Sequence, residues 1–192
     1  MNRRLGRSFF ARDALDVAPE LLGKVLAAGA CRGRIVEVEA YRSDEPASHT
    51  FRGRTPRTTV MFGPAGHLYV YFTYGMHHCA NIVTGADGDG QAVLLRAVTP
   101  LAGADVMRSR RGGAAGRPVA DRRLADGPGK LCQAFSLDRT ANGLDLCARR
   151  DAGVTVVDDG TAPPEQPIVT PRIGIRMATD LPWRWVAPDG FR

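Results

Sequence analysis

Apolar and polar residues alternate along several short stretches of the chain, and this period of two predicts β-strands. In Leu68–Thr73, three apolar side chains alternate with two tyrosines and a threonine, and a second apolar stretch follows at 79–84. Tyr74 and Gly75 between them predict a tight turn, so residues 68–84 are expected to form a hairpin. A further strand is predicted over 91–98, and shorter ones over 24–28, 154–157, 173–176 and 183–186.

A strand predicted over residues 35–41 combines a core face with a charged face. Alternation places Val36, Val38 and Ala40 in the core, and the opposite face carries Ile35, Glu37, Glu39 and Tyr41. A buried carboxylate is costly unless it is paired or functional. Glu39 is therefore either the ion-pair partner of an arginine such as Arg96 or the acid of an active site. Glu37 could be the functional acid itself, a residue that supports that acid, or a surface residue.

Three helices are expected between the strands. Asp16 is placed to cap a short helix over 18–22, and Thr99-Pro100 to start a second one near 101–111. The third covers 130–135, and the backbone N–H groups at its start could hold a phosphate. Arg32-Gly33 is expected to form a turn. Short strands with a few interleaved helices predict an α+β fold, a single domain over 1–192 around a curved, mainly antiparallel sheet with flanking helices.

The charge balance favours an anionic partner. The chain of 192 residues has a formal net charge of +6, and a cationic excess attracts nucleic acid or anionic membranes. The four cysteines are widely spaced, which predicts buried thiols rather than a zinc site or a disulfide framework. No apolar run is long enough for a signal peptide or a membrane span. We therefore expect a cytoplasmic protein, a monomer with no membrane partner.

Ring-bearing side chains are concentrated in residues 34–96. All four histidines and all four tyrosines lie there, and no Asp or Glu occurs between Glu45 and Asp87. Within this interval, residues 42–66 read as a long loop, and loops of this length are often functional. Flat rings beside basic residues can stack on nucleobases. The same tyrosines can equally be strand residues that pack in the core.

The residue pattern leaves rival functions open. A metal-dependent nuclease could use a ligand set of Glu37, Glu39, Asp44 and His49. A catalytically silent DNA-bending protein would need only the basic surface. The sequence contains no P-loop, no dinucleotide-binding glycine motif and no hydrolase elbow.

Separated blocks of the sequence resemble the alkyladenine (3-methyladenine) DNA glycosylase family. They are RIVEVEAY, a histidine about ten residues later, TPRTTVMF, LYVYFTYGMHHCANIV, AVLLRAVTP, GPGKLCQAF and TPRIGI, and they extend from about residue 8 to Trp185. The resemblance implies a DNA N-glycosylase of base excision repair. Such an enzyme flips an alkylated or deaminated purine out of double-stranded DNA and hydrolyses its N-glycosidic bond, leaving an abasic site.

The family pattern also implies residue roles. Glu39 would be the general base that activates water, and Arg96 would help to hold that water. The base pocket would be lined by Tyr41, His49, Tyr71 and Asn81, and Asn81 would crowd the exocyclic amine of guanine. No metal and no cofactor are implied. The reaction would be monofunctional, because no lysine lies in the matched catalytic blocks.

DNA contacts follow from the same pattern. Tyr74 would enter the minor groove and fill the space left by the flipped nucleotide, supported by Met76 and His77. Contacts with the DNA backbone are expected from Arg54, Arg57 and Lys130. The loop at 112–123 diverges from the family pattern.

Overall fold

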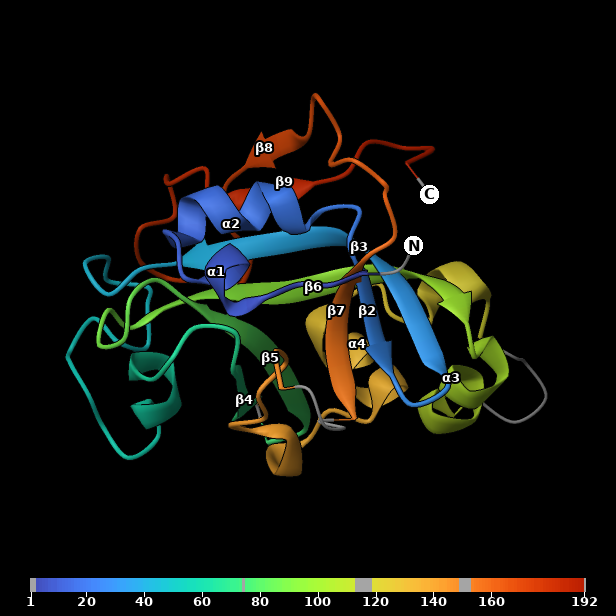
Figure 1. The fold of residues 1–192 in the computed structure, drawn as a ribbon, viewed down its shortest axis with the longest axis horizontal. Coiled ribbons are helices and arrows are strands. Elements are labelled where there is room, and N and C mark those ends of the chain that lie inside the picture. The colour runs from blue at the N-terminus through green and yellow to red at the C-terminus, as the bar shows by residue number, and fades with distance from the viewer. Residues whose placement is uncertain (1–2, 74, 113–118, 149–152, 192) are drawn as a thin grey trace.

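One antiparallel sheet organises the computed structural model, which describes residues 3–73, 75–112, 119–148 and 153–191. Its order is β1-β7-β2-β3-β6-β5-β4, and β9 and β8 extend it from β3 (Figure 1). The strands are β1 (Arg3–Arg4), β2 (Val25–Ala28), β3 (Cys31–Tyr41), β4 (Leu68–Thr73), β5 (His77–Thr84), β6 (Gln91–Ala102), β7 (Val154–Asp158), β8 (Ile168–Thr170) and β9 (Arg184–Val186). The sheet curls around its core, and the predicted α+β class is confirmed.

Strand β3 is the centre of the sheet. It pairs with β6 along one edge, whereas its other edge pairs first with β2 and then with β9. The pairing with β6 is interrupted three times, because Val36 is an extra residue on β3 and Arg96 and Leu101 are extra residues on β6. Such β-bulges reorient the side chains that follow them.

The bulge at Val36 corrects the predicted faces of this strand. Ile35 is fully buried in the main core with Val38 and Ala40, whereas Val36 is only partly buried. Strict alternation had placed Val36 in the core and Ile35 on the charged face. The structure confirms a common face for Glu37, Glu39 and Tyr41, because Arg96 bonds both glutamates and the Tyr41 hydroxyl bonds Glu39.

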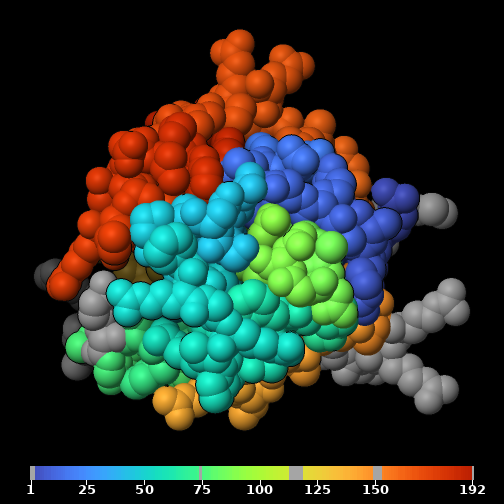
Figure 2. All heavy atoms as spheres, turned by 90° about the vertical axis from the view of Figure 1, so that its left-hand side faces the viewer, coloured from blue at the N-terminus to red at the C-terminus, as the bar shows by residue number. Residues whose placement is uncertain are grey.

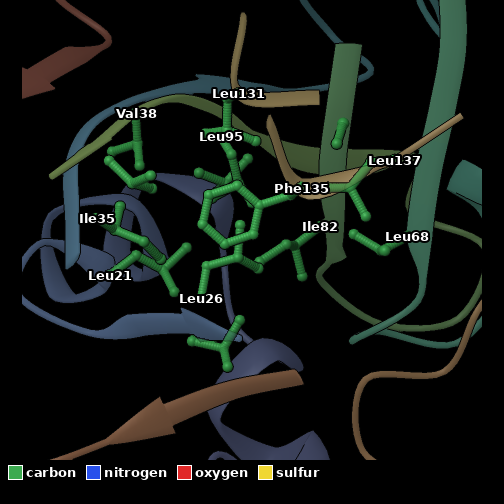
Figure 3. Close-up of a cluster of buried hydrophobic side chains, with 14 of the residues drawn as sticks. Leu21, Leu26, Ile35, Val38, Leu68, Ile82, Leu95, Leu131, Phe135 and Leu137 are labelled. Carbon is green, nitrogen blue, oxygen red and sulfur yellow. The ribbon is translucent and has the colours of Figure 1, made fainter. Parts of the chain in front are cut away.

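Helices cover the core. They are α1 (Arg7–Phe10), α2 (Ala14–Leu21), α3 (Ala104–Arg111) and α4 (Pro128–Phe135). Leu21 of α2 and Leu131 and Phe135 of α4 meet strand side chains such as Ile35 and Leu95 (Figure 3). The close approach of α4 explains a glycine within β3, because a Cβ at Gly33 would lie 2.6 Å from Val98 and 3.0 Å from Phe135.

Several predicted boundaries were wrong. Helix α2 begins earlier than expected, and its cap is Asp13, which accepts from the Leu15 N–H, while Asp16 lies in the first turn. Arg32-Gly33 continues β3 instead of turning, and Pro100 belongs to β6 instead of starting a helix. Residues 173–176 are not a strand; the strand of this region is β8, a few residues earlier. Within the described ranges, no helix is long and apolar enough to cross a membrane.

Candidate active site

A cavity of about 480 Å³ opens on the sheet face that bears Glu39. Its volume suits a small organic ligand. Four parts of the chain line it: the face of β3, β4, β5 and β6, Pro128 at the start of α4, the segment 46–61, and the segment 173–177. The last two are far apart in sequence but lie side by side on one face of the molecule, in cyan and red (Figure 2).

Strand register brings the candidate residues together. Glu39 pairs with Leu94, Leu94 with Asn81, and Asn81 with Tyr69, so one row crosses β3, β6, β5 and β4. Tyr41 and Tyr71 lie two residues further along their own strands, on the same face. Four residues predicted to line a base pocket, namely Tyr41, His49, Tyr71 and Asn81, all line this cavity.

Glu39 is fully buried, and three donors surround its carboxylate. Oε1 accepts from the backbone N–H of Ile173 at 2.8 Å and lies 3.1 Å from Nη1 of Arg96. Oε2 accepts from the hydroxyl of Tyr41 at 2.8 Å. Burial, then the charge of Glu39 and the hydrogen bond to it, raises the pKa of Tyr41 far above its ordinary value. Tyr41 therefore remains a donor at neutral pH.

The β6 bulge aims Arg96 at two carboxylates. Its Nε donates to Oε1 of Glu37 at 2.7 Å while its Nη1 contacts Glu39. Arg184 on β9 donates to the same Glu37 oxygen, also at 2.7 Å. Burial alone would lower the pKa of Arg96, but the charges of Glu39 and Glu37 outweigh it and raise that pKa. Arg96 is thus a fixed cation in the cavity wall, and Glu37 holds it in place.

An aromatic group of His49, Tyr69 and Tyr71 forms another part of the cavity lining. The His49 ring meets the Tyr71 ring edge-on at 4.6 Å, and Tyr69 stacks with Tyr71 at 5.6 Å. His49 Nδ1 lies 3.1 Å from the Tyr69 hydroxyl. Its ring is partly open to solvent, yet burial among these groups, followed by the charge of Arg57, lowers the pKa of His49 to about 4. The imidazole is therefore neutral at neutral pH.

The C-terminal wall was not predicted from the sequence. Arg172 is fully buried and binds both carboxylate oxygens of Glu45, at 2.6 and 2.8 Å. Its guanidinium also lies 4.6 Å from the centroid of the Tyr41 ring. The contact between Ile173 and Glu39 joins residues 134 positions apart. Only the TPRIGI block pointed to this segment, and the pattern of apolar residues there was misread as a strand.

The remaining predicted DNA-contact residues lie outside the cavity, except Arg57. Met76 is 68% exposed just after the hairpin turn, and His77 packs against Gly129 in the first turn of α4. Arg54 is exposed, and Lys130 is paired with Asp126 at 2.7 Å. Arg57 lies over the Tyr71 ring at 5.3 Å. The predicted wedge residue, Tyr74, lies outside the described residues.

The ligand set of the rival nuclease does not converge. Glu37 and Glu39 are bound by arginines, and Asp44 bonds Arg42. Among the described residues, no three His, Cys, Asp or Glu side chains are grouped so that they could hold a metal ion. The rings of Tyr41, His49, Tyr69 and Tyr71 line the cavity, and such a lining suits an organic ring system.

A buried carboxylate lies behind the aromatic lining of this cavity, and comparison with known proteins places the chain among DNA glycosylases. The methylpurine-DNA glycosylase family model matches residues 8–190, so the chain belongs to that family. A relative from Burkholderia lata is 55% identical over 188 residues, covering 96% of this chain and 87% of the relative. A relative from Streptomyces avermitilis is 46% identical, and the match covers 96% of this chain and 88% of the relative. A relative from Carboxydothermus hydrogenoformans is also 46% identical, and the match covers 94% of this chain and 93% of the relative. The names of all three assign them provisionally as 3-methyladenine DNA glycosylases.

Proposed function

We propose that this protein is a monofunctional DNA N-glycosylase that removes alkylated or deaminated purines from double-stranded DNA in base excision repair. The damaged nucleotide flips into the cavity, and a water activated by Glu39 cleaves its N-glycosidic bond. The observation that carries this proposal is the position of Glu39, which is fully buried and bonded to three residues that line an aromatic cavity, Tyr41, Arg96 and Ile173, in a chain of this family.

The contacts of Glu39 leave one of its acceptor positions free to bind a proton. An ionised carboxylate has about four acceptor positions. Ile173 and Arg96 occupy those of Oε1, and Tyr41 occupies one on Oε2. The remaining position on Oε2 accepts a proton from water as the water oxygen attacks C1′ of the sugar. The bond from C1′ to the purine nitrogen breaks, and the base takes the bonding electrons as it leaves.

The aromatic walls provide the binding energy. Tyr41, His49 and Tyr71 all line the cavity, and each stacked base–ring contact contributes roughly 1–3 kcal/mol. A cationic alkylated purine is additionally attracted to ring faces. Asn81 is held by a hydrogen bond from its amide to the Tyr69 carbonyl at 3.1 Å, and this orientation lets it crowd the exocyclic amine of guanine.

The residues proposed to contact DNA are assigned from the positions of basic side chains and of the hairpin turn. Tyr74, with Met76 and His77 beside it, acts as the wedge, which fits a turn between β4 and β5. Arg54, Arg57 and Lys130 contact backbone phosphates. Strand cleavage does not follow base release, because no lysine is among the described residues that line the cavity.

A base-release assay tests the proposal. Purified protein is incubated with duplexes that each carry one defined lesion (3-methyladenine, 7-methylguanine, hypoxanthine or ethenoadenine), with and without excess EDTA. We expect free base from at least one duplex, in equal amounts in both conditions, and an intact strand until alkali is added. Release that requires a divalent metal, or no release from any lesion, would contradict the proposal.

A further inference from the structure

A buried ion pair between Arg172 and Glu45 lies against the ring of Tyr41. Arg172 donates through Nη1 to the Ala40 carbonyl at 2.9 Å, in addition to its two bonds with Glu45. Its guanidinium is flanked by the ring of Tyr41 at 4.6 Å and the ring of Trp183 at 5.2 Å. Because Tyr41 also lines the cavity, Arg172 supports the side of the ring that a bound base does not use.

The same side chain joins the two walls of the cavity. On one side, Glu45 accepts from the Ala47 N–H at 2.8 Å, and Ala47 lines the cavity. On the other side, Arg172 is followed directly by Ile173, whose N–H donates to Glu39. A shift of the Arg172–Glu45 pair would therefore move the Ile173 donor and the Tyr41 ring together.

Building on the proposed function, we propose that Arg172 is a positioning residue, which with Glu45 fixes the Tyr41 hydroxyl and the Ile173 N–H on the catalytic carboxylate. A buried ion pair adds little net stability over apolar packing, but it imposes one geometry on its neighbours. Arg172 meets this condition with two carboxylate bonds, a carbonyl bond and two ring contacts from one planar group. Lysine keeps the charge but lacks the plane and the paired donors.

The chain offers a matched control in Arg34. This arginine is also buried, binds both oxygens of Asp159 at 3.3 and 2.9 Å, and donates to the Gly23 carbonyl at 2.7 Å. Within the described residues, the buried Nε atoms of both Arg34 and Arg172 lack a hydrogen-bond partner. Neither arginine lines the cavity, but Arg172 lies against the cavity-lining ring of Tyr41 and directly precedes Ile173. Replacing each arginine with lysine thus removes similar contacts, but only one of the changes touches the site.

The experiment measures base release under single-turnover conditions, with enzyme in excess over dimethyl sulfate-treated duplex DNA, together with the Kd for that DNA and the melting temperature. For Arg172→Lys we expect the rate constant to fall about 10²-fold, since a displacement of roughly 1 Å at a reacting group has that effect. The Kd should change less than about tenfold. Arg34→Lys should melt at a similarly reduced temperature and keep a rate constant within about twofold of the wild type.

The outcomes separate this inference from the function itself. A wild-type rate constant in folded Arg172→Lys, or an equal loss in Arg34→Lys, would overturn the positioning role alone. A wild-type protein that releases no base would overturn both proposals. If Arg172→Lys does not fold, Glu45→Gln decides the question, because it keeps the shape and weakens the same pair. We expect Glu45→Gln to slow base release at least fivefold, and an unchanged rate would refute the inference.

Discussion

The substitution Glu39→Gln isolates the proposed base without rebuilding the cavity. The new amide oxygen can replace Oε1, which accepts from the Ile173 N–H and lies beside Nη1 of Arg96. The amide nitrogen then faces the Tyr41 hydroxyl, which currently donates to Oε2. That hydroxyl can rotate and accept instead, since a phenol oxygen has both functions. All three polar neighbours of the side chain therefore keep a hydrogen bond with it.

The cost to stability is modest and can be worked out from these contacts. The variant replaces charge-assisted hydrogen bonds with neutral ones, a difference of about 1–2 kcal/mol. Arg96 keeps its 2.7 Å bond to Glu37, so it is not left as an unpaired buried charge. In a chain of this length, each kcal/mol lowers the melting temperature by about 2–4 °C. We expect a melting temperature lower by several degrees, and binding of damaged duplex close to that of the wild type.

The effect on chemistry is much larger. Removing a general base lowers the rate about 10²–10⁴-fold. The assay is single-turnover release of free base. Glu37→Gln is the matched control, because Glu37 bonds Arg96 and Arg184, whereas Glu39 bonds the cavity-lining Tyr41 and Ile173 as well as Arg96. The control should lose less than about tenfold. If Glu39→Gln retained more than roughly a tenth of the wild-type rate, or if the control lost as much, the assignment of Glu39 as the base would be wrong.

Three further predictions concern pH, selectivity and salt. Because the pKa of His49 is about 4 in the folded protein and about 6.5 in the unfolded chain, stability from this residue is present above about pH 6.5 and decreases toward pH 4. His49→Gln should therefore narrow the difference in melting temperature between about pH 7 and pH 5, and an unchanged difference would contradict this. Asn81→Ala should raise release of undamaged guanine relative to the damaged base about tenfold, since a small steric contact has roughly this weight; an unaltered ratio would remove Asn81 from lesion selection. If about four phosphates are contacted, a fourfold rise in salt should weaken DNA binding about 10²-fold, and binding independent of salt would argue against a DNA substrate.

Local sequence patterns were sufficient to predict the part of the site that lies on the sheet. Period-two alternation put Glu39 and Tyr41 on one face, and the hairpin prediction placed Tyr71 and Asn81 on neighbouring strands, as the register confirms. Such inferences succeed because a strand's faces are set by geometry within a few residues. The contact of Arg96 with Glu39, one of the alternatives from the sequence, is present as an ion pair.

The part of the site that the sequence did not predict depends on contacts between segments that are far apart in the chain. Nothing near Arg172 in the sequence shows that its partner is Glu45, 127 positions away. The apolar residues at 173 and 175 resemble a strand locally, yet this segment is held by one backbone bond to Glu39 and lines the cavity. Tertiary contacts here override the local preference, as they commonly do for β-propensity.

The bulges at Val36 and Arg96 explain how one sheet can contribute both to a hydrophobic core and to a charged site. In a regular strand, a face that carries Glu37 and Glu39 would also carry Ile35, and this large apolar side chain would be withdrawn from the core. The extra residue at Val36 reverses the faces once, so Ile35 is buried in the core while the glutamates line up with Tyr41. The extra residue at Arg96 makes the matching adjustment on β6, where the side chain reaches both carboxylates. Deleting Val36 should therefore disturb the core and the site together.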